Sequence, residues 1–160
     1  MNFLKIILFF IVSQNLLAEK VEITSDSMNA MDLNKEVHFI GNAKVKQLKD
    51  WIHADKIIVH LNKDNQAKMY EAIGEVTFEF QNDKGHYIGS SNVVKYYPLT
   101  SLYVLIGKAK VNDVLNGRSA KGGKITVDML TGNSSVTGEK NLKGKKSGPV
   151  TFTFDSVKKK

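Results

Sequence analysis

The sequence predicts an all-β fold built from a repeated antiparallel unit. A motif around a glycine recurs at a fixed period, apolar and polar residues alternate within it, and turn-forming residues separate the segments at strand-length intervals. Self-similarity at a fixed period indicates a repeat architecture, in which one unit cannot bury its apolar face without neighbours. Many short strands at this spacing are typical of a β sandwich, roll or barrel whose strand pairs are joined by hairpins.

The recurring motif is centred on Gly41, Gly74 and Gly107, which are spaced 33 residues apart. Its copies read Phe-Ile-Gly-Asn-Ala-Lys-Val, Ala-Ile-Gly-Glu-Val-Thr-Phe and Leu-Ile-Gly-Lys-Ala-Lys-Val. Residues two apart on a strand share a face, and the apolar residues of each copy keep the same parity, so each copy predicts a long strand with one apolar side. The glycine inside it would leave room for a bend or a close backbone approach.

A second unit fills the gaps between the glycine strands. Its clearest copy is Ile-His-Ala-Asp-Lys-Ile-Ile-Val-His-Leu at residues 52–61, and looser copies begin at Ile23, Ile88 and Ala120. The alternation slips by one residue across the pair formed by a small residue and Asp, Ser or Gly. Such a slip predicts a bulge or sharp bend, where a strand turns a corner of a curved sheet. Turn clusters separate the units at residues 34–35, 62–65, 82–85, 98–100, 116–117 and 131–133.

The C-terminal part departs from the repeat. Residues 136–138 resemble a degraded fourth glycine strand, and a lysine-rich loop follows at residues 140–146. Pro149 precedes the alternating segment 150–154, after which the chain ends in three lysines. Because proline at a strand start is tolerated best at a sheet edge, the segment 150–154 is predicted to be an edge strand.

The first 18 residues have the pattern of a secretory signal peptide. Lys5 supplies the positive charge, residues 6–12 the apolar run, and Leu-Leu-Ala at 16–18 a possible cleavage site. Polar residues interrupt the apolar run well short of the roughly 20 residues that a membrane-spanning helix requires. We therefore expect a cleaved signal peptide at 1–18 and one domain at 19–160 with a basic C-terminal tail. The alternative is an uncleaved anchor.

Composition restricts the classes of partner. The chain has 160 residues, no cysteine, and a net charge of +7 from 23 Lys and Arg against 16 Asp and Glu. Without disulfides the fold must rest on its apolar core. The positive charge suits phosphates or anionic lipid, but the lysines are scattered and the sequence contains no recognisable nucleic-acid-binding module. No nucleic acid partner is expected.

Catalytic motifs are absent from the sequence. It has no Cys nucleophile, no G-x-S-x-G elbow, no H-E-x-x-H and no P-loop, so neither an enzyme nor a cofactor is expected. His53 and Asp55 lie two apart and could share a face as metal ligands or an acid–base pair. Since no third ligand recurs in register, the favoured interpretation is that they decorate a bend. Trp51, Tyr96 and Tyr97 are predicted to pack in the core or at its rim.

The apolar face of the strands is the candidate binding site. Its predicted inward-facing members are Phe39, Val45, Ile57, Val59, Val76, Phe78, Phe80, Leu105, Val111, Ile125 and Val127, together with Val37 and Leu61. They fill a closed core, as in a structural β-repeat protein without a ligand, or they line an open, elongated groove. A repeat that grows along one axis favours the groove, but the sequence alone does not distinguish the groove from the closed core.

Two motifs resemble the OstA-like family of lipopolysaccharide-transport proteins. They are Ile-x-Ala-Asp-Lys-Ile-x-Val at residues 52–59 and Phe-x-Gly-Asn-Ala-x-Val at residues 39–45, and the resemblance extends over about residues 20–155. It implies an open, twisted β-jellyroll with a V-shaped section, whose apolar interior holds the acyl chains of lipid A. It also implies that Val21, Ile23 and Phe78 lie on strands lining that groove. The sequence departs from the pattern at Gly122-Gly123, where the family has Ala-Asp, and in its lysine-rich end.

The resemblance further implies a role and partners. The expected protein is periplasmic, binds lipopolysaccharide, and bridges the inner and outer membranes between LptC-like and LptD-like proteins for outer-membrane assembly. An LptC-like protein is an alternative. Head-to-tail homo-oligomers would form through the edge strands at 21–24 and 150–154, unless the flanking lysines blunt these edges. The sequence contains no energy source, so transport would be passive, with its direction imposed by partners.

Overall fold

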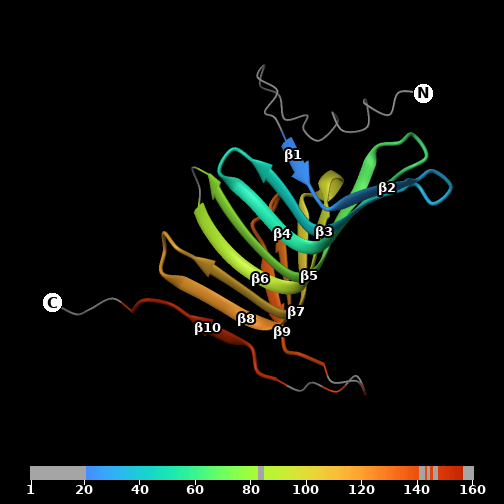
Figure 1. Ribbon diagram of the computed structural model, residues 1–160. Helices are drawn as coiled ribbons and strands as arrows, with labels where there is room; N and C mark the ends of the chain where they lie inside the picture. The colour runs from blue at the N-terminus through green and yellow to red at the C-terminus, as the bar shows by residue number, and fades with distance from the viewer. Residues whose placement is uncertain (1–20, 83–84, 141–142, 144, 146–147, 157–160) are drawn as a thin grey trace.

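The computed structural model describes residues 21–156 except 83–84, 141–142, 144 and 146–147. The predicted signal peptide and the last lysines lie outside the described residues. The described chain forms one antiparallel sheet of ten strands (Figure 1). Its elements are β1 (Val21–Thr24), β2 (Ser27–Met31), β3 (Glu36–Gln47), β4 (Asp50–Leu61), β5 (Ala67–Asn82), β6 (Gly85–Tyr97), the 3-10 helix η2 (Pro98–Thr100), β7 (Leu102–Asp113), β8 (Arg118–Asp128), β9 (Ser134–Thr137) and β10 (Thr151–Thr153).

The strand order shows an open sheet. Strands β3 to β8 pair consecutively as an antiparallel meander. At one end β1 and β2 pair with different halves of β3, and at the other β9 and β10 pair with different halves of β8. Within the described residues the order runs from β1 to β10 without closing. The all-β prediction, the open jellyroll and the edge position of residues 150–154 are confirmed.

A crease crosses the sheet at the predicted bends. Every consecutive pair from β3 to β8 shifts register at this level; the shifts fall between Ile40 and Ala43, His53 and Lys56, Ile73 and Val76, Ser90 and Val93, and Ile106 and Ala109. Gly41, Gly74 and Gly107 lie at the crease with φ of +80°, +86° and +78°. This left-handed region is open to glycine at little cost, which explains why the glycine recurs.

Close contact is the second reason for these glycines. A Cβ on Gly74 would collide with the carboxylate of Asp55, and a Cβ on Gly107 would lie 2.6 Å from Nδ2 of Asn92. Each glycine is therefore covered by the Asp or Asn of the neighbouring bent strand. The last bent strand, β8, differs because Gly123 stands where the others have Asp or Asn. A Cβ on Gly123 would lie 2.6 Å from the backbone nitrogen of Glu139. The absence of side chains at Gly122 and Gly123 therefore leaves room for the backbone at the end of β9 and after it.

The crease divides the sheet into two arms. The first arm holds β2, β9 and the segments of the long strands at 36–40, 56–61, 67–73, 93–97, 102–106 and 124–128. The second arm holds β1, β10 and the segments at 43–47, 50–54, 76–82, 85–91, 109–113 and 118–122. Because the long strands curve, the arms face each other (Figure 1). The ring centroids of Phe80, in the second arm, and Tyr103, in the first, are 5.8 Å apart.

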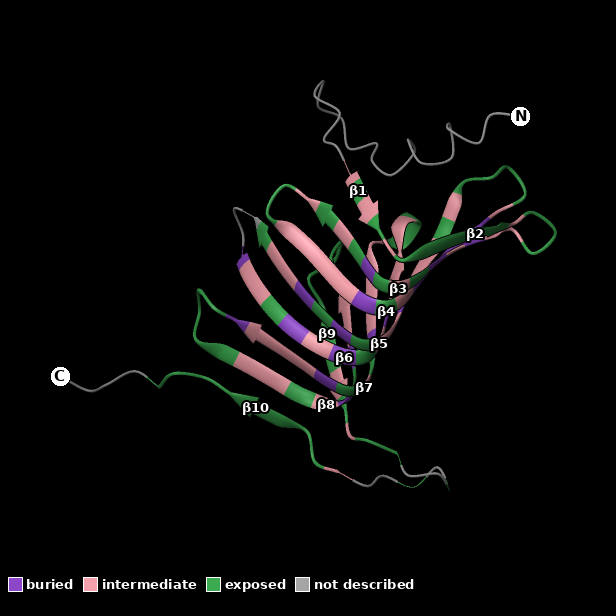
Figure 2. Ribbon diagram, viewed as in Figure 1, coloured by how far each residue is buried: buried purple, intermediate pink, exposed green. Residues whose placement is uncertain are grey.

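One apolar core joins the arms along the crease. We call its most enclosed part the floor: Ala43, Ala54, Val76, Phe78 and Ala109. Val76 is 0% and Phe78 3% exposed. Small residues at the crease let the arms approach, and the larger chains on either side complete the packing. The buried segments on β4, β5 and β6 follow this line in Figure 2.

The outer face of the first arm mixes apolar side chains with charged ones, which form a linked ion-pair network. Glu36 contacts Nε2 of His38 at 2.7 Å and Nδ1 of His60 at 3.2 Å. Glu71 contacts Nε2 of His60 at 3.1 Å and Nζ of Lys95 at 3.1 Å. The hydrogen bond from His38 is the main reason that the pKa of Glu36 lies below its ordinary value of 4.5. The two faces of this arm are therefore chemically distinct.

Candidate functional site

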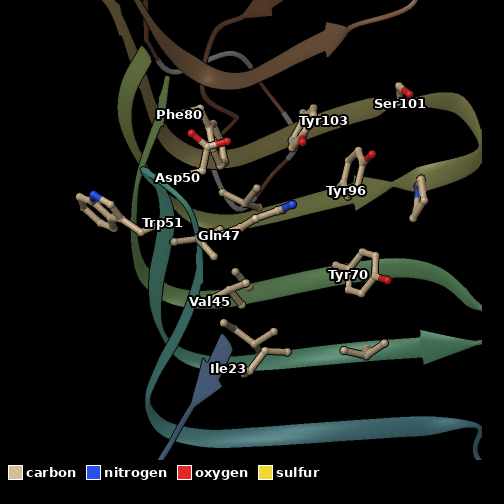
Figure 3. A pocket seen from close by; sticks show the side chains of 16 residues that line it. Ile23, Val45, Gln47, Asp50, Trp51, Tyr70, Phe80, Tyr96, Ser101 and Tyr103 are labelled. Carbon is tan, nitrogen blue, oxygen red and sulfur yellow. The ribbon is translucent and has the colours of Figure 1, made fainter. Parts of the chain in front are cut away.

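A cavity of about 460 Å³ lies between the arms, above the floor (Figure 3). We call this region the mouth. Side chains of β1, β3, β4, β5, β6 and β7 line it, together with η2 and the residue after it. The lining residues are Ile23, Val45, Gln47, Asp50, Trp51, Ile52, Ile57, Val59, Tyr70, Ala72, Phe80, Val94, Tyr96, Pro98, Ser101 and Tyr103.

The wall from the first arm is an aromatic row above buried aliphatic residues. Tyr70, Tyr96 and Tyr103 lie on the successive strands β5, β6 and β7, in register with one another. The ring centroids of Tyr70 and Tyr96 are 6.1 Å apart, and those of Tyr96 and Tyr103 are 4.4 Å apart, both stacked. Burial raises the pKa of Tyr70 and of Tyr103 well above its usual range, so both hydroxyls are neutral at physiological pH.

The wall from the second arm consists of aliphatic side chains and Phe80, while the ring of Trp51, on the same arm, points away from the cavity (Figure 3). Ile23 of β1 pairs with Val45 of β3, which pairs with Ile52 of β4, so the three side chains form a row across the strands. Phe80 of β5 stacks on Phe78 at 5.0 Å. This wall joins the first one where Phe80 meets Tyr103. The two walls together make an apolar slot between the arms.

Polar groups lie at the rim of the slot. Gln47 and Asp50 flank the β3–β4 turn, and Ser101 follows η2. Asp50 accepts a hydrogen bond from the backbone nitrogen of Gln81 at 2.7 Å. After burial and the neighbouring Tyr96, the negative charge of Asp50 is a further cause of the raised pKa of Tyr103. The lining residues include Asp50 but neither Lys, Arg nor His.

The residues predicted to line the groove divide between mouth and core. Ile23, Val45, Ile57, Val59 and Phe80 line the cavity. Phe39, Val76, Phe78, Leu105 and Ile125 are buried in the core, and Val111 and Val127 are half-buried against it. Val21 is half-buried on β1, next to Gln47 of β3. The fold thus brings five of the thirteen together at the cavity.

Sequence reasoning placed Tyr96 in the core or at its rim, but it included none of the three tyrosines of the first wall in the predicted groove. A signal for them exists in the repeat, because Tyr70 precedes Gly74 and Tyr103 precedes Gly107 by the same four positions. The inward-facing residues two positions from the glycine, such as Val76 and Leu105, are buried. Tyr70 and Tyr103, four positions before it, lie at the cavity, although Phe78, four positions after Gly74, is buried.

His53 and Asp55 do not form a site. His53 is half-buried on the outer face, and Asp55 covers Gly74. Among the described residues no cluster of three or more His, Cys, Asp or Glu could hold a metal ion. The described part of the chain also contains no helix that is long and apolar enough to cross a membrane.

Comparison with known proteins places the chain in a family. Residues 22–133, from β1 past the end of β8, match the model of the family described as LptA/(LptD N-terminal domain) LPS transport protein. The chain belongs to this family. Its members are transport proteins, which agrees with the expectation that the chain is not an enzyme, and the resemblance to the OstA-like family is confirmed. A comparison with curated protein sequences found no match.

A solved structure has the same fold. It is LptH, described as the LptA homologous periplasmic component of the conserved lipopolysaccharide transport device from Pseudomonas aeruginosa. The superposition has a TM-score of 0.70 and covers 86% of this chain and 96% of LptH, at 16% sequence identity. At this identity the likeness concerns the fold.

Proposed function

We propose that this protein binds lipopolysaccharide in the periplasm and carries it between the membranes, with acyl chains of lipid A held between the two arms. The observation that carries the proposal is the open apolar cavity at the mouth. Its volume of about 460 Å³ lies in the range of ligand pockets. Each CH₂ group that leaves water for such a site contributes about 0.8 kcal/mol.

Family membership supports the identity of the ligand and the location. The family is one of lipopolysaccharide transport proteins, and LptH is a periplasmic component of that device. The signal-peptide pattern at residues 1–18 is consistent with export to the periplasm. Intact-mass measurement of the mature protein should show a start near Glu19. Retention of Met1 in a membrane fraction would contradict it.

The two ends of the sheet suit head-to-tail assembly. β1 and β10 are the last strands of the order, each in the second arm. Phe152 and Phe154 near the C-terminal end are 59% and 61% exposed, and their rings lie 5.8 Å apart. Phe152 pairs with the inward-facing Ala120, so it extends the inner apolar face beyond β8. Strand addition between β1 of one copy and β10 of another would continue the groove along a filament.

The same edges would meet LptC-like and LptD-like partners at the two membranes. Deleting residues 149–160 removes β10 and should leave a folded protein that binds lipid but does not polymerise. Sedimentation at rising concentration checks this. A full-length chain that stays monomeric, or a truncated chain that still polymerises, would contradict edge pairing.

A matched pair of variants tests the lipid site. Val45 lines the cavity and Thr77 is exposed on the outer face of β5, and the two side chains have similar shape. Val45→Glu places an unpaired carboxylate in the apolar slot, where its desolvation is unfavourable. We expect lipopolysaccharide to displace an apolar dye at least tenfold less effectively from Val45→Glu than from Thr77→Glu, with both β spectra retained. Equal displacement would exclude the cavity as the lipid site.

A further inference from the structure

We infer that the rim of the cavity is a polar subsite that selects an uncharged hydrogen-bonding group at the head of a bound acyl chain and disfavours an anionic head. The expected ligand is a lipid whose acyl chain is attached to an uncharged head group that carries hydroxyl or amide groups. This inference rests on the proposed function, because it concerns the same cavity. It identifies the part of the lipid that lies at the rim.

The cavity is graded from apolar depth to polar rim. Ile57, Val59, Ala72 and Val94 are its buried members; three of them, Ile57, Ala72 and Val94, lie within two residues of the crease, and Val59 pairs with Tyr70. The tyrosine row lies two residues farther out along β5 and β6, and Ser101 lies beyond it, after η2. Figure 3 shows Asp50 beside Phe80 and Tyr103, on the side of the cavity opposite Ile23. A chain that enters methyl end first leaves its head group among these polar side chains.

The charge of the rim determines which head groups it accepts. Asp50 supplies a carboxylate, and no cationic side chain is among the lining residues. A carboxylate accepts hydrogen bonds from hydroxyl or amide donors, whereas it repels a second anion more strongly in a partly desolvated site than in water. The exposed lysines Lys44 and Lys46 of β3 lie on the opposite face from Val45. Phosphate groups therefore find no counter-charge inside the slot.

Stacking holds the tyrosine row in place, and Tyr70 and Tyr103 carry neutral hydroxyls. Tyr96 stacks against both Tyr70 and Tyr103, which limits the motion of its ring. Tyr103 is also linked to Tyr96 by a side-chain hydrogen bond. Neutral phenol hydroxyls donate and accept, so they can bind hydroxyl, ester or amide groups at a fixed height above the floor. Preorganisation of this kind favours selective binding because little ordering remains to be done.

Three lipids with the same fourteen-carbon chain test the inference. Monomyristoylglycerol has a neutral head with two hydroxyls, methyl myristate has a neutral head without donors, and myristate is anionic at pH 8. Each is used to displace an apolar dye from the full mature protein. We expect monomyristoylglycerol to bind about tenfold more tightly than myristate, with methyl myristate between them, as one hydrogen bond to a charged group predicts.

Two substitutions assign the preference to the rim. Asp50→Asn removes the charge and keeps an oxygen that can accept from the Gln81 nitrogen. It should raise myristate affinity about tenfold and leave methyl myristate unchanged. Asp64→Asn removes the same charge from an exposed turn and should change none of the three affinities. Tyr103→Phe should lower monomyristoylglycerol affinity about threefold to tenfold and methyl myristate affinity less, because the methyl ester can only accept a hydrogen bond whereas the glycerol hydroxyls can also donate.

The outcomes separate this inference from the proposed function. If the three lipids bind equally, or myristate binds most tightly, the polar subsite is refuted while acyl-chain binding stands. An equal gain in myristate affinity from Asp64→Asn would also refute it, because the effect would then be one of net charge. If none of the lipids displaces the dye and lipopolysaccharide also fails to do so, both the subsite and the proposed function are refuted.

Discussion

The floor and the mouth of the folded sheet are built from the same strands and face the same interior, yet they differ in packing. At the floor, Val76 and Phe78 are almost completely enclosed. At the mouth, Val45, Phe80 and Tyr96 surround an open cavity. The strands are continuous between the two regions, and distance from the crease separates them. The fold therefore contains both a closed core and an open groove. The arms pack against each other at the crease and diverge away from it.

Each region has its own requirement. The floor needs small or well-fitted side chains, because the arms converge there and a cavity would cost stability. The mouth needs apolar walls that are far enough apart to admit a ligand. Substitutions should consequently affect stability at the floor and ligand binding at the mouth.

The largest expected effect compares two phenylalanines on β5. Phe78 and Phe80 share a face and stack on each other, but Phe78 is buried and Phe80 is half-buried at the cavity. We expect Phe78→Ala to lower the free energy of unfolding by about 3–5 kcal/mol, and Phe80→Ala by about half as much. Urea denaturation measures both. Equal losses would remove the distinction between floor and mouth.

The crease itself is tested by two glycines with similar backbone angles. Gly74 has φ +86° and its missing Cβ is covered by Asp55, whereas Gly132 has φ +73° and nothing within 4 Å of the Cβ position. Gly132→Ala should cost about 1 kcal/mol of unfolding free energy from backbone strain. Gly74→Ala should cost about 2–3 kcal/mol, because the collision adds to the same strain.

A double variant isolates the collision. Asp55→Gly removes the side chain over Gly74, as Gly123 does naturally at the end of the series. Combined with Gly74→Ala, it should cost less than the sum of the two single variants, which is the sign of coupled neighbours. If the losses of unfolding free energy measured by urea denaturation are strictly additive, close contact with Asp55 does not explain why residue 74 is a glycine.

The repeat explains how much of the fold could be predicted from the sequence. Alternation around Gly41, Gly74 and Gly107 predicts the strands, their shared inner face and a bend, because side-chain direction is a local property of the backbone. The slip across Ala54 and Asp55 likewise marks the register shift at the crease. These features follow from the chain alone.

The candidate site was less predictable because the burial of a side chain between the arms depends on residues that are distant in the sequence. Val76 and Phe80 have the same parity, but the approach of the opposite arm decides that one is enclosed and the other lines the cavity. Tyr70 and Tyr96 stand opposite each other through strand pairing, which spacing does not specify without the register. Asp50 lies next to a turn, where the alternation of apolar and polar residues does not predict the direction of the side chain.

The smallest expected effect lies on the outer face. The pKa of Glu36 is lowered chiefly by its hydrogen bond with His38, so its ionised form stabilises the fold at pH values above the ordinary value of 4.5. That stability is lost as pH falls through the lowered pKa. Glu36→Gln should therefore differ from the wild type by less than about 1 kcal/mol at pH 5.5, and the difference should shrink as the pH is lowered below 4.5. A difference that persists unchanged to pH 3, measured by urea denaturation, would contradict this assignment.

The most direct test of the central claim is photo-crosslinking of lipopolysaccharide to single sites. A photoreactive phenylalanine analogue replaces Val45 or Tyr96 at the mouth, and Ile88 or Ile106 on the outer face, where both isoleucines are exposed. Lipopolysaccharide should crosslink to the two mouth positions and not to the two outer positions, with folding verified by circular dichroism. Crosslinking at Ile88 or Ile106 without crosslinking at Val45 and Tyr96 would contradict the account, because the lipid would then bind outside the arms.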